Sequence, residues 1–195
     1  GVVAGEPRLL QLAGQGQPGQ QPTFLFFAAV HALLLAGSEH PLRQFYPSIV
    51  GEAALAPSDA GPALVDFCLA HEEPLTRLIS TRLVQSNVVK RALPLRLGLA
   101  AIAQETREPV HLIEVGASAG LLLRFDRYGY TLGGQRFGDR ASPVQIEADW
   151  QSERPVPDLD ILPPLASVQG IDLNPLDAAN PNDRFWLEAL VWPEN

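Results

Sequence analysis

The stretch "HLIEVGASAG", His111 to Gly120, decides how the second half of the chain is interpreted. It ends the apolar run "PVHLIEV", which is rich in branched residues and is followed by glycines, the pattern of a buried strand that enters a tight turn. The letters fit two motifs with different chemistry. "GASAG" fits G-x-S-x-G, the elbow that presents a hydrolase serine. "EVGASAG" fits the acidic residue and glycines of a nucleotide-binding strand-turn-helix.

The elbow hypothesis makes Ser118 a nucleophile, which needs a histidine base that a carboxylate orients. In the α/β-hydrolase chain order the histidine follows the serine. The histidines of this chain all precede Ser118; they are His31, His40, His71 and His111. The first half also lacks the strands that such a fold places before its elbow. We therefore rank the serine hydrolase below the nucleotide site.

The nucleotide hypothesis places Glu114 at the end of the first strand. Gly116 and Gly120 would allow a tight turn and a close backbone approach to a ligand. A helix that begins at Ala119 would point its positive N-terminal end at that ligand. A second strand, "VQGIDLNP", would end at Asp172, whose carboxylate is placed to bind ribose hydroxyls. The two acidic residues together strengthen a glycine motif that is weak alone.

The chain divides by pattern into a mainly helical region, 1–107, and the start of an α/β domain, 108–195. The first region contains "FLFFAAVHALLLAG", Phe24 to Gly37, which is shorter than the roughly 20 residues of a membrane span and predicts a buried helix. The second reads as strand, glycine turn, helix, a hairpin insertion at about 128–150, strand and helix. Two strands with a crossover favour a parallel pair. The predicted fold class is α/β, with a Rossmann-like segment behind a helical N-terminal region.

Composition excludes several classes of function. Hydrophobic residues make up 46% of the 195 residues, as expected for a globular chain with a core. The net charge of −8 argues against a nucleic-acid partner. We expect no membrane span and no metal site, because Cys68 and His71 are two potential ligands where a site needs three or four. With one cysteine no intrachain disulfide forms, and we expect a cytoplasmic protein.

The motifs "EVGASAG" and "GIDLNP" together resemble the first two motifs of S-adenosylmethionine-dependent methyltransferases, over Val110 to about Pro175. The resemblance implies S-adenosylmethionine as cofactor, with the turn against its methionine part and the second acidic residue on its ribose. The residues that it assigns to the cofactor are Glu114, Gly116, Ala117, Ser118, Gly120, Asp172 and Asn174.

The whole chain is identified as a member of the bacterial DUF2332 family, which is uncharacterised. The matching stretches are "FFAAVHALLL", "FYPS", "DFCLAH", "TRLVQSNVVKRA", "LIEVGASAGLLLRFDRY" and "GIDLNPLDAANPNDRFWLEALVWPE". Membership implies a methyltransferase-like core and a longer chain with a further C-terminal part. Two positions depart from the family pattern. Val88 stands where the family reads "QTNE", and Leu122 stands where it reads "SAGLNL", so each exchanges a polar group for an apolar one.

Further polar residues are candidates for a substrate pocket; they are His31, Tyr46, Gln85, Asn87, Arg91 and Asp126. Each also has a structural explanation. His31 can be a hydrogen-bonded core histidine. The letters "YPS" can place Tyr46 and Ser48 at a pocket, or they can form a turn that Pro47 orders. Ser86 or Asn87 can cap a helix. Asp126 can belong to a surface ion pair.

The preferred function is binding of S-adenosylmethionine, with methyl transfer to a small molecule as the reaction, although the sequence names no catalytic base. The first alternative is a non-catalytic binding or interaction protein with a methyltransferase-like fold, which the two apolar departures favour. The second is the hydrolase that uses Ser118.

Overall fold

The computed structural model describes residues 2–85 and 87–192. The chain forms two compact units: unit 1 consists of Gly1–Ser86 and Ala178–Asn195, and unit 2 of Asn87–Asp177. Unit 2 is thus an insertion in the sequence of unit 1. The expected division at residue 107 followed the change from helical to strand pattern, whereas packing assigns the helix at 92–105 to unit 2 and the last helix to unit 1.

Unit 1 is helical throughout its described residues. Its α-helices are α1 (Val2–Gly5), α2 (Pro7–Ala13), α3 (Pro22–Leu35), α4 (Pro47–Val50), α5 (Gly61–Ala70), α6 (Glu72–Thr81) and α8 (Pro181–Ala189). Short 3₁₀ helices connect them: η1 (Pro41–Phe45), η2 (Gly51–Ala53) and η3 (Pro57–Asp59).

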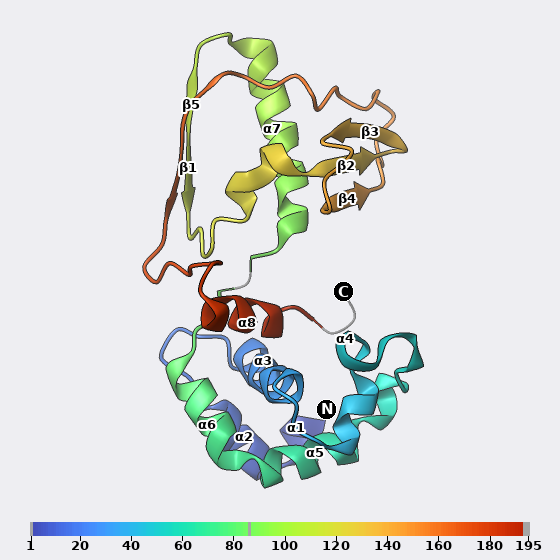
Figure 1. Cartoon of the computed structure of the whole chain (residues 1–195), viewed down its shortest axis with the longest axis vertical. Coiled ribbons are helices and arrows are strands. Elements are labelled where there is room, and N and C mark those ends of the chain that lie inside the picture. The colour runs from blue at the N-terminus through green and yellow to red at the C-terminus, as the bar shows by residue number, and fades with distance from the viewer. Residues whose placement is uncertain (1, 86, 193–195) are drawn as a thin grey trace. The chain divides into compact units, whose positions relative to one another are not determined.

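Helix α3 lies at the centre of unit 1, in contact with α2, α6 and α8 (Figure 1). The residues of α3 are apolar on every face of the helix, so other helices must cover it on all sides. Phe26, Ala29 and Val30 are completely buried. The predicted buried helix is therefore confirmed. Among the described residues, we find no helix with the length and apolar character that crossing a membrane requires.

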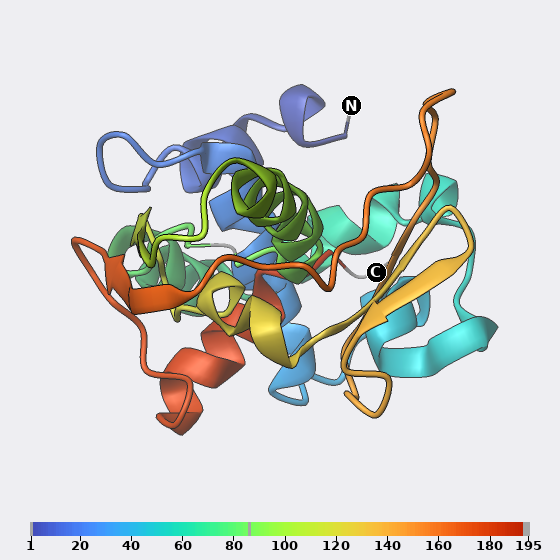
Figure 2. The same ribbon diagram turned by 90° about the horizontal axis from the view of Figure 1, so that it is seen from above.

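Unit 2 contains the two strands expected on either side of the insertion. β1 (Val110–Val115) and β5 (Leu165–Ile171) pair in parallel, with Val115 opposite Ile171. Helix α7 (Ala92–Glu105) and the 3₁₀ helix η5 (Leu122–Arg127) lie on one side of this pair (Figures 1 and 2); η4 (Val89–Arg91) precedes α7. The predicted parallel pair is confirmed.

The helix predicted from Ala119 is wrong. After the glycine turn the chain forms only η5, six residues long, in which Arg124 departs from helical dihedral angles. The φ angles of Ser118 and Gly120 are 51° and 70°, and this left-handed backbone is incompatible with a right-handed helix. The helical segment after the turn is therefore a short 3₁₀ helix that begins at Leu122.

The predicted hairpin is present. β2 (Gly129–Leu132) and β3 (Gln135–Gly138) pair antiparallel across Gly133-Gly134, both of which have positive φ, as a tight two-residue hairpin turn requires. β4 (Gln145–Ala148) then pairs with β2 in parallel, so the insertion is a three-stranded sheet in the order β3-β2-β4.

The other face of the β1–β5 pair is open among the described residues. Ile113, Val115 and Ile171 are 54%, 82% and 55% exposed. Parallel sheets are normally covered on both faces. The structure thus establishes a mixed α/β chain with two small sheets, and the Rossmann-like character of the second segment stays a prediction.

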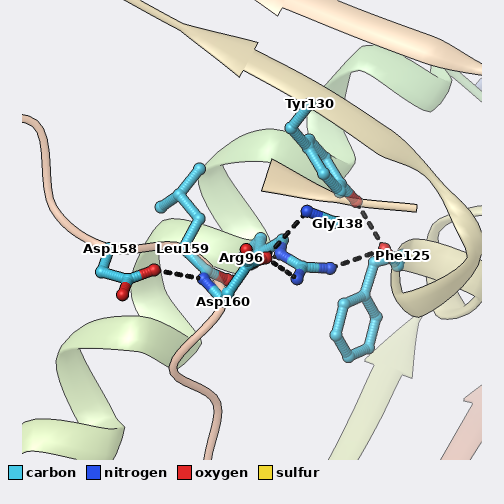
Figure 3. A network of polar contacts seen from close by, with 7 residues as sticks. All are labelled: Arg96, Phe125, Tyr130, Gly138, Asp158, Leu159 and Asp160. Carbon is cyan, nitrogen blue, oxygen red and sulfur yellow. Dashed lines mark hydrogen bonds and ion pairs between the residues drawn. The ribbon is translucent and has the colours of Figure 1, made fainter. Parts of the chain in front are cut away.

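A buried arginine of α7 contacts both the three-stranded sheet and the segment that precedes β5 (Figure 3). Arg96 of α7 is 5% exposed, and its Nε donates to the Leu159 carbonyl at 2.8 Å. Its Nη2 lies 3.0 Å from Asp160 Oδ1, which also accepts the backbone N–H of Gly138 at 2.7 Å. The guanidinium stacks on Tyr130, 5.0 Å from the ring centroid. Arg96 thus ties α7 to the three-stranded sheet and to the connector before β5.

Candidate functional site

The glycine turn after β1 is held from the end of β5. Asp172 follows β5, and its Oδ2 accepts the backbone N–H of Ser118 at 2.7 Å. Its Oδ1 accepts the backbone N–H of Asn174 at 2.8 Å, and the Ser118 carbonyl accepts the N–H of Leu176 at 3.2 Å. The structure therefore brings the two predicted motifs together at the carboxyl ends of adjacent parallel strands.

Most backbone N–H groups of the turn donate hydrogen bonds to other groups of the protein. Gly116 and Ala117 both donate to the Ile171 carbonyl, at 2.7 and 3.2 Å, and Gly120 donates to the Ala117 carbonyl at 2.7 Å. Together with the Ser118 bond to Asp172, these contacts remove the donors that a phosphate cradle uses. The turn is thus unsuited to a nucleotide phosphate.

Two acceptor atoms beside the turn are buried and have no hydrogen-bond partner among the described residues. They are Glu114 Oε2 and Asn87 Oδ1. Asn87 is anchored by its other amide atom, since Nδ2 donates to the Ala117 carbonyl at 2.9 Å. A buried acceptor without a partner costs free energy, so a ligand that donates hydrogen bonds would be stabilised here.

The electrostatic surroundings of Glu114 also favour a ligand that donates hydrogen bonds or carries positive charge. Burial raises the pKa of the Glu114 carboxyl; the positive charge of Arg91 lowers this pKa and the negative charge of Asp172 raises it. Two carboxyl groups thus act on each other at this edge of the sheet. A cationic ligand would relieve both the burial cost and the repulsion.

The other residues predicted for a substrate pocket are spread over both units. Within unit 2, Asp126 Oδ2 lies 3.4 Å from Arg127 Nε, as the surface ion-pair alternative predicts. Gln85 and the pair His31 and Tyr46 belong to unit 1. Ser86, weighed as a helix cap, lies outside the described residues.

His31 and Tyr46 line one cavity of unit 1, of about 330 Å³. Its wall is largely apolar and includes Phe24, Phe27, Leu64 and Trp192. These two candidates are therefore grouped by the fold, but in a pocket of their own.

The structure adds no support for Ser118 as a hydrolase nucleophile. Ser118 is 7% exposed, and the histidine of unit 2, His111, lies near the start of β1. At about 3.3 Å per residue, His111 is roughly 13 Å from the end of that strand. Its Nδ1 is 2.8 Å from Ser167 Oγ, a neighbour on β5. Within unit 2 the fold therefore separates the serine from a histidine base.

Comparison with known proteins agrees with the sequence features. A family model described as "Uncharacterized protein conserved in bacteria (DUF2332)" matches residues 2–195. The chain belongs to this family. No curated protein matches it, and no solved structure does. Membership in DUF2332 assigns no activity, so function has to be argued from the site.

The two apolar departures from the family pattern have different surroundings. Val88 is 48% exposed, so its side chain borders solvent. Leu122 is 9% exposed and lies at the start of η5.

Among the described residues, no group of three or more His, Cys, Asp or Glu side chains lies close enough together to hold a metal ion.

Sequence reasoning missed two contacts. One is the Arg96 network, for which the only signal was a lone arginine in an apolar helix. The other is a contact of His31 Nε2 with Ser48 Oγ at 2.8 Å, across 17 positions of sequence. His31 and Ser48 had each been weighed separately for a pocket, but nothing in the sequence paired them.

Proposed function

We propose that the edge of unit 2 formed by the glycine turn and Asp172 binds S-adenosylmethionine, in a Rossmann-like segment. Open α/β sheets bind ligands in the crevice outside the carboxyl ends of their strands. The ends of β1 and β5 meet at this edge, and the contact of Ser118 with Asp172 fixes them together. Position in the fold therefore supports a ligand site here.

The observation that carries the proposal is the buried acceptor of Glu114. Its Oε2 has no partner among the described residues, and burial raises the pKa of the carboxyl group. S-adenosylmethionine carries an ammonium group, a sulfonium charge and ribose hydroxyls, so it offers positive charge and hydrogen-bond donors. A phosphate-bearing nucleotide would instead meet two carboxylates and a turn with few donors to offer.

The residues divide the work of binding. Glu114 accepts the ammonium group, and Asn87 Oδ1 accepts a second donor of the ligand. A carboxylate has acceptor sites for about four hydrogen bonds, so Asp172 can hold the turn and a ribose hydroxyl together. The bound cofactor supplies the electrophilic methyl group. The protein's part is to hold a small-molecule acceptor in line with it.

A second candidate is a binding protein that uses the same site without catalysis. Leu122 favours it, because a buried apolar side chain stands where the family pattern has an asparagine. In this case the cofactor binds, but no methyl transfer follows.

The test compares thermal unfolding with and without S-adenosylmethionine for the wild type and Glu114→Gln, with Glu108→Gln as the matched control at an exposed carboxylate. Ligand at about 100 times its dissociation constant should add roughly 2.7 kcal/mol to the unfolding free energy. Glu114→Gln should weaken binding by about tenfold or more, since hydrogen bonds to charged groups contribute about 1.5–3 kcal/mol. Glu108→Gln should bind as the wild type does.

The pH dependence supplies a second readout. The ligand's positive charge favours ionised Glu114, whose pKa in the free protein is raised, so affinity should increase as pH rises through this titration. Absence of any stabilisation at millimolar cofactor would overturn the proposal. Binding in the absence of transfer to any acceptor would favour the second candidate.

A further inference from the structure

His31 has a defined tautomer inside the apolar helix α3. It is 4% exposed, and its Nδ1 lies 3.1 Å from the Ala189 carbonyl oxygen. A carbonyl oxygen only accepts, so Nδ1 carries a proton, and Nε2 is the nitrogen that can act as a base when the ring is neutral. Catalytic histidines that activate a serine have this arrangement, with one nitrogen held by an acceptor and the other facing the hydroxyl.

Ser48 faces that base. Its Oγ is 2.8 Å from His31 Nε2, inside the range of about 2.6–3.2 Å expected between a nucleophile and its general base. Ser48 lies in α4 and is an exposed residue, whereas the ring that it contacts is buried. Ser48 has both the base and the access that a nucleophile needs.

The cavity of unit 1 supplies a place for a substrate. His31 lines it, so the Ser48 hydroxyl lies one hydrogen bond from its wall. The volume of about 330 Å³ falls in the range of roughly 300–1,000 Å³ that small-molecule pockets occupy. Phenylalanine, leucine and tryptophan side chains make up much of the wall, which suits an aliphatic or aromatic group and not a charged one.

We propose that unit 1 carries a second activity: hydrolysis of carboxylic esters with an apolar acyl group, with Ser48 as nucleophile and His31 as general base. Ser48 Oγ forms a bond to the ester carbonyl carbon while its proton passes to His31 Nε2. The carbon–oxygen bond to the alcohol then breaks, and the alcohol leaves with that proton. Water attacks the acyl-serine, gives one proton to His31, and releases the acid as Ser48 regains its proton. Ester and water thus become acid and alcohol.

The first experiment treats the full chain with a fluorophosphonate that carries an aliphatic chain, followed by mapping of the labelled serine. The variants are Ser48→Ala, His31→Asn and, as a matched control, Ser80→Ala, because Ser80 of α6 is a serine of the same unit that does not line the cavity and whose hydroxyl donates to the Arg77 carbonyl. The amide of His31→Asn can still donate to the Ala189 carbonyl while it removes the base. Thermal unfolding of each variant checks that it is folded.

We expect labelling at Ser48, loss of labelling in Ser48→Ala, and a fall of about 100-fold or more in the labelling rate of His31→Asn, since general base catalysis contributes about 10²–10⁴-fold. Ser80→Ala should be labelled as the wild type is. Hydrolysis of a nitrophenyl ester of a medium-length fatty acid should follow the same order.

Three results would overturn the proposal: no labelling of Ser48 in the folded wild type, labelling at Ser118 in its place, or equal labelling rates with and without His31. If His31→Asn does not fold, Ser48→Ala and the mapping of the labelled serine in the wild type still decide. Ser48→Ala should leave stabilisation by S-adenosylmethionine unchanged, so this inference and the cofactor proposal can fail separately.

Discussion

The carboxylate of Asp172 accepts the backbone N–H of Ser118 at 2.7 Å, although the two residues are 54 positions apart. This contact joins the loop that follows β5 to the turn that follows β1. The sequence motif suggested Asp172 as a ligand-binding residue, and the structure gives it a structural task as well. Its substitution therefore tests folding before it tests binding.

Replacement of Asp172 by alanine should destabilise unit 2 without any cofactor. The change removes the acceptor of the Ser118 and Asn174 N–H groups, and we expect a loss of about 1–3 kcal/mol in unfolding free energy. Asp172→Asn keeps one acceptor oxygen and should lose less. Urea unfolding of both variants measures this, with protection of the Ser118 amide from hydrogen exchange as the local readout. Equal stability of Asp172→Ala and the wild type would contradict it.

Removal of the buried guanidinium should have a larger effect. Arg96→Met removes the Nε donor of the Leu159 carbonyl and the ion-pair partner of Asp160, and we expect a loss of about 2–4 kcal/mol. The control Arg107→Met removes the same charge from an exposed site and should change stability by less than about 0.5 kcal/mol. Denaturant unfolding followed by a probe in unit 2 makes the comparison. Similar losses in the two variants would show that charge, not the buried contacts, matters.

Alkaline pH should destabilise unit 2 through Tyr130. Burial raises the pKa of its hydroxyl to about 12, above the ordinary value near 10, while its O–H donates to the Phe125 carbonyl at 2.7 Å. A raised pKa contributes stability that is fully present below pH 10 and is lost as pH rises from 10 to 12. The full loss is about 3 kcal/mol.

Unfolding by urea at a series of pH values from 9 to 11.5, in the wild type and in Tyr130→Phe, follows this loss. The variant is less stable at pH 9, but its unfolding free energy should fall less steeply with pH. Parallel curves for the two proteins would rule out Tyr130 as the cause.

Cys68 should be inert in the folded protein. Its side chain is completely buried, and burial raises the pKa of the thiol to about 12, so almost no thiolate is present at pH 8. A disulfide reagent at pH 8 should therefore react at least about 100-fold more slowly with native protein than with protein in urea. Because the chain has one cysteine, the signal is unambiguous. Rapid reaction of the native protein would mean that α5 opens readily.

The elements that the sequence predicted well are those whose pattern is local. An apolar run of helical length became the buried helix α3, and Gly133-Gly134 marked the hairpin turn. The strand pair β1–β5 was also predicted, because branched apolar runs and a crossover leave few other arrangements. The helix expected from Ala119 was wrong, because the turn before it adopts left-handed dihedral angles that the letters do not reveal.

The sequence by itself determined the family, the mixed α/β composition and the two motifs at the ends of β1 and β5, since each is written in neighbouring residues. Tertiary structure alone decided which distant groups meet: Arg96 with Asp160, His31 with Ser48, and the carboxyl group of Glu114 with the charge of Asp172. It also decided that the chain forms two compact units, with the sequence of unit 2 inserted in the sequence of unit 1. The physical reason is that burial and hydrogen-bond partners depend on packing between segments far apart in the chain, whereas helix, strand and turn preferences act over a few residues.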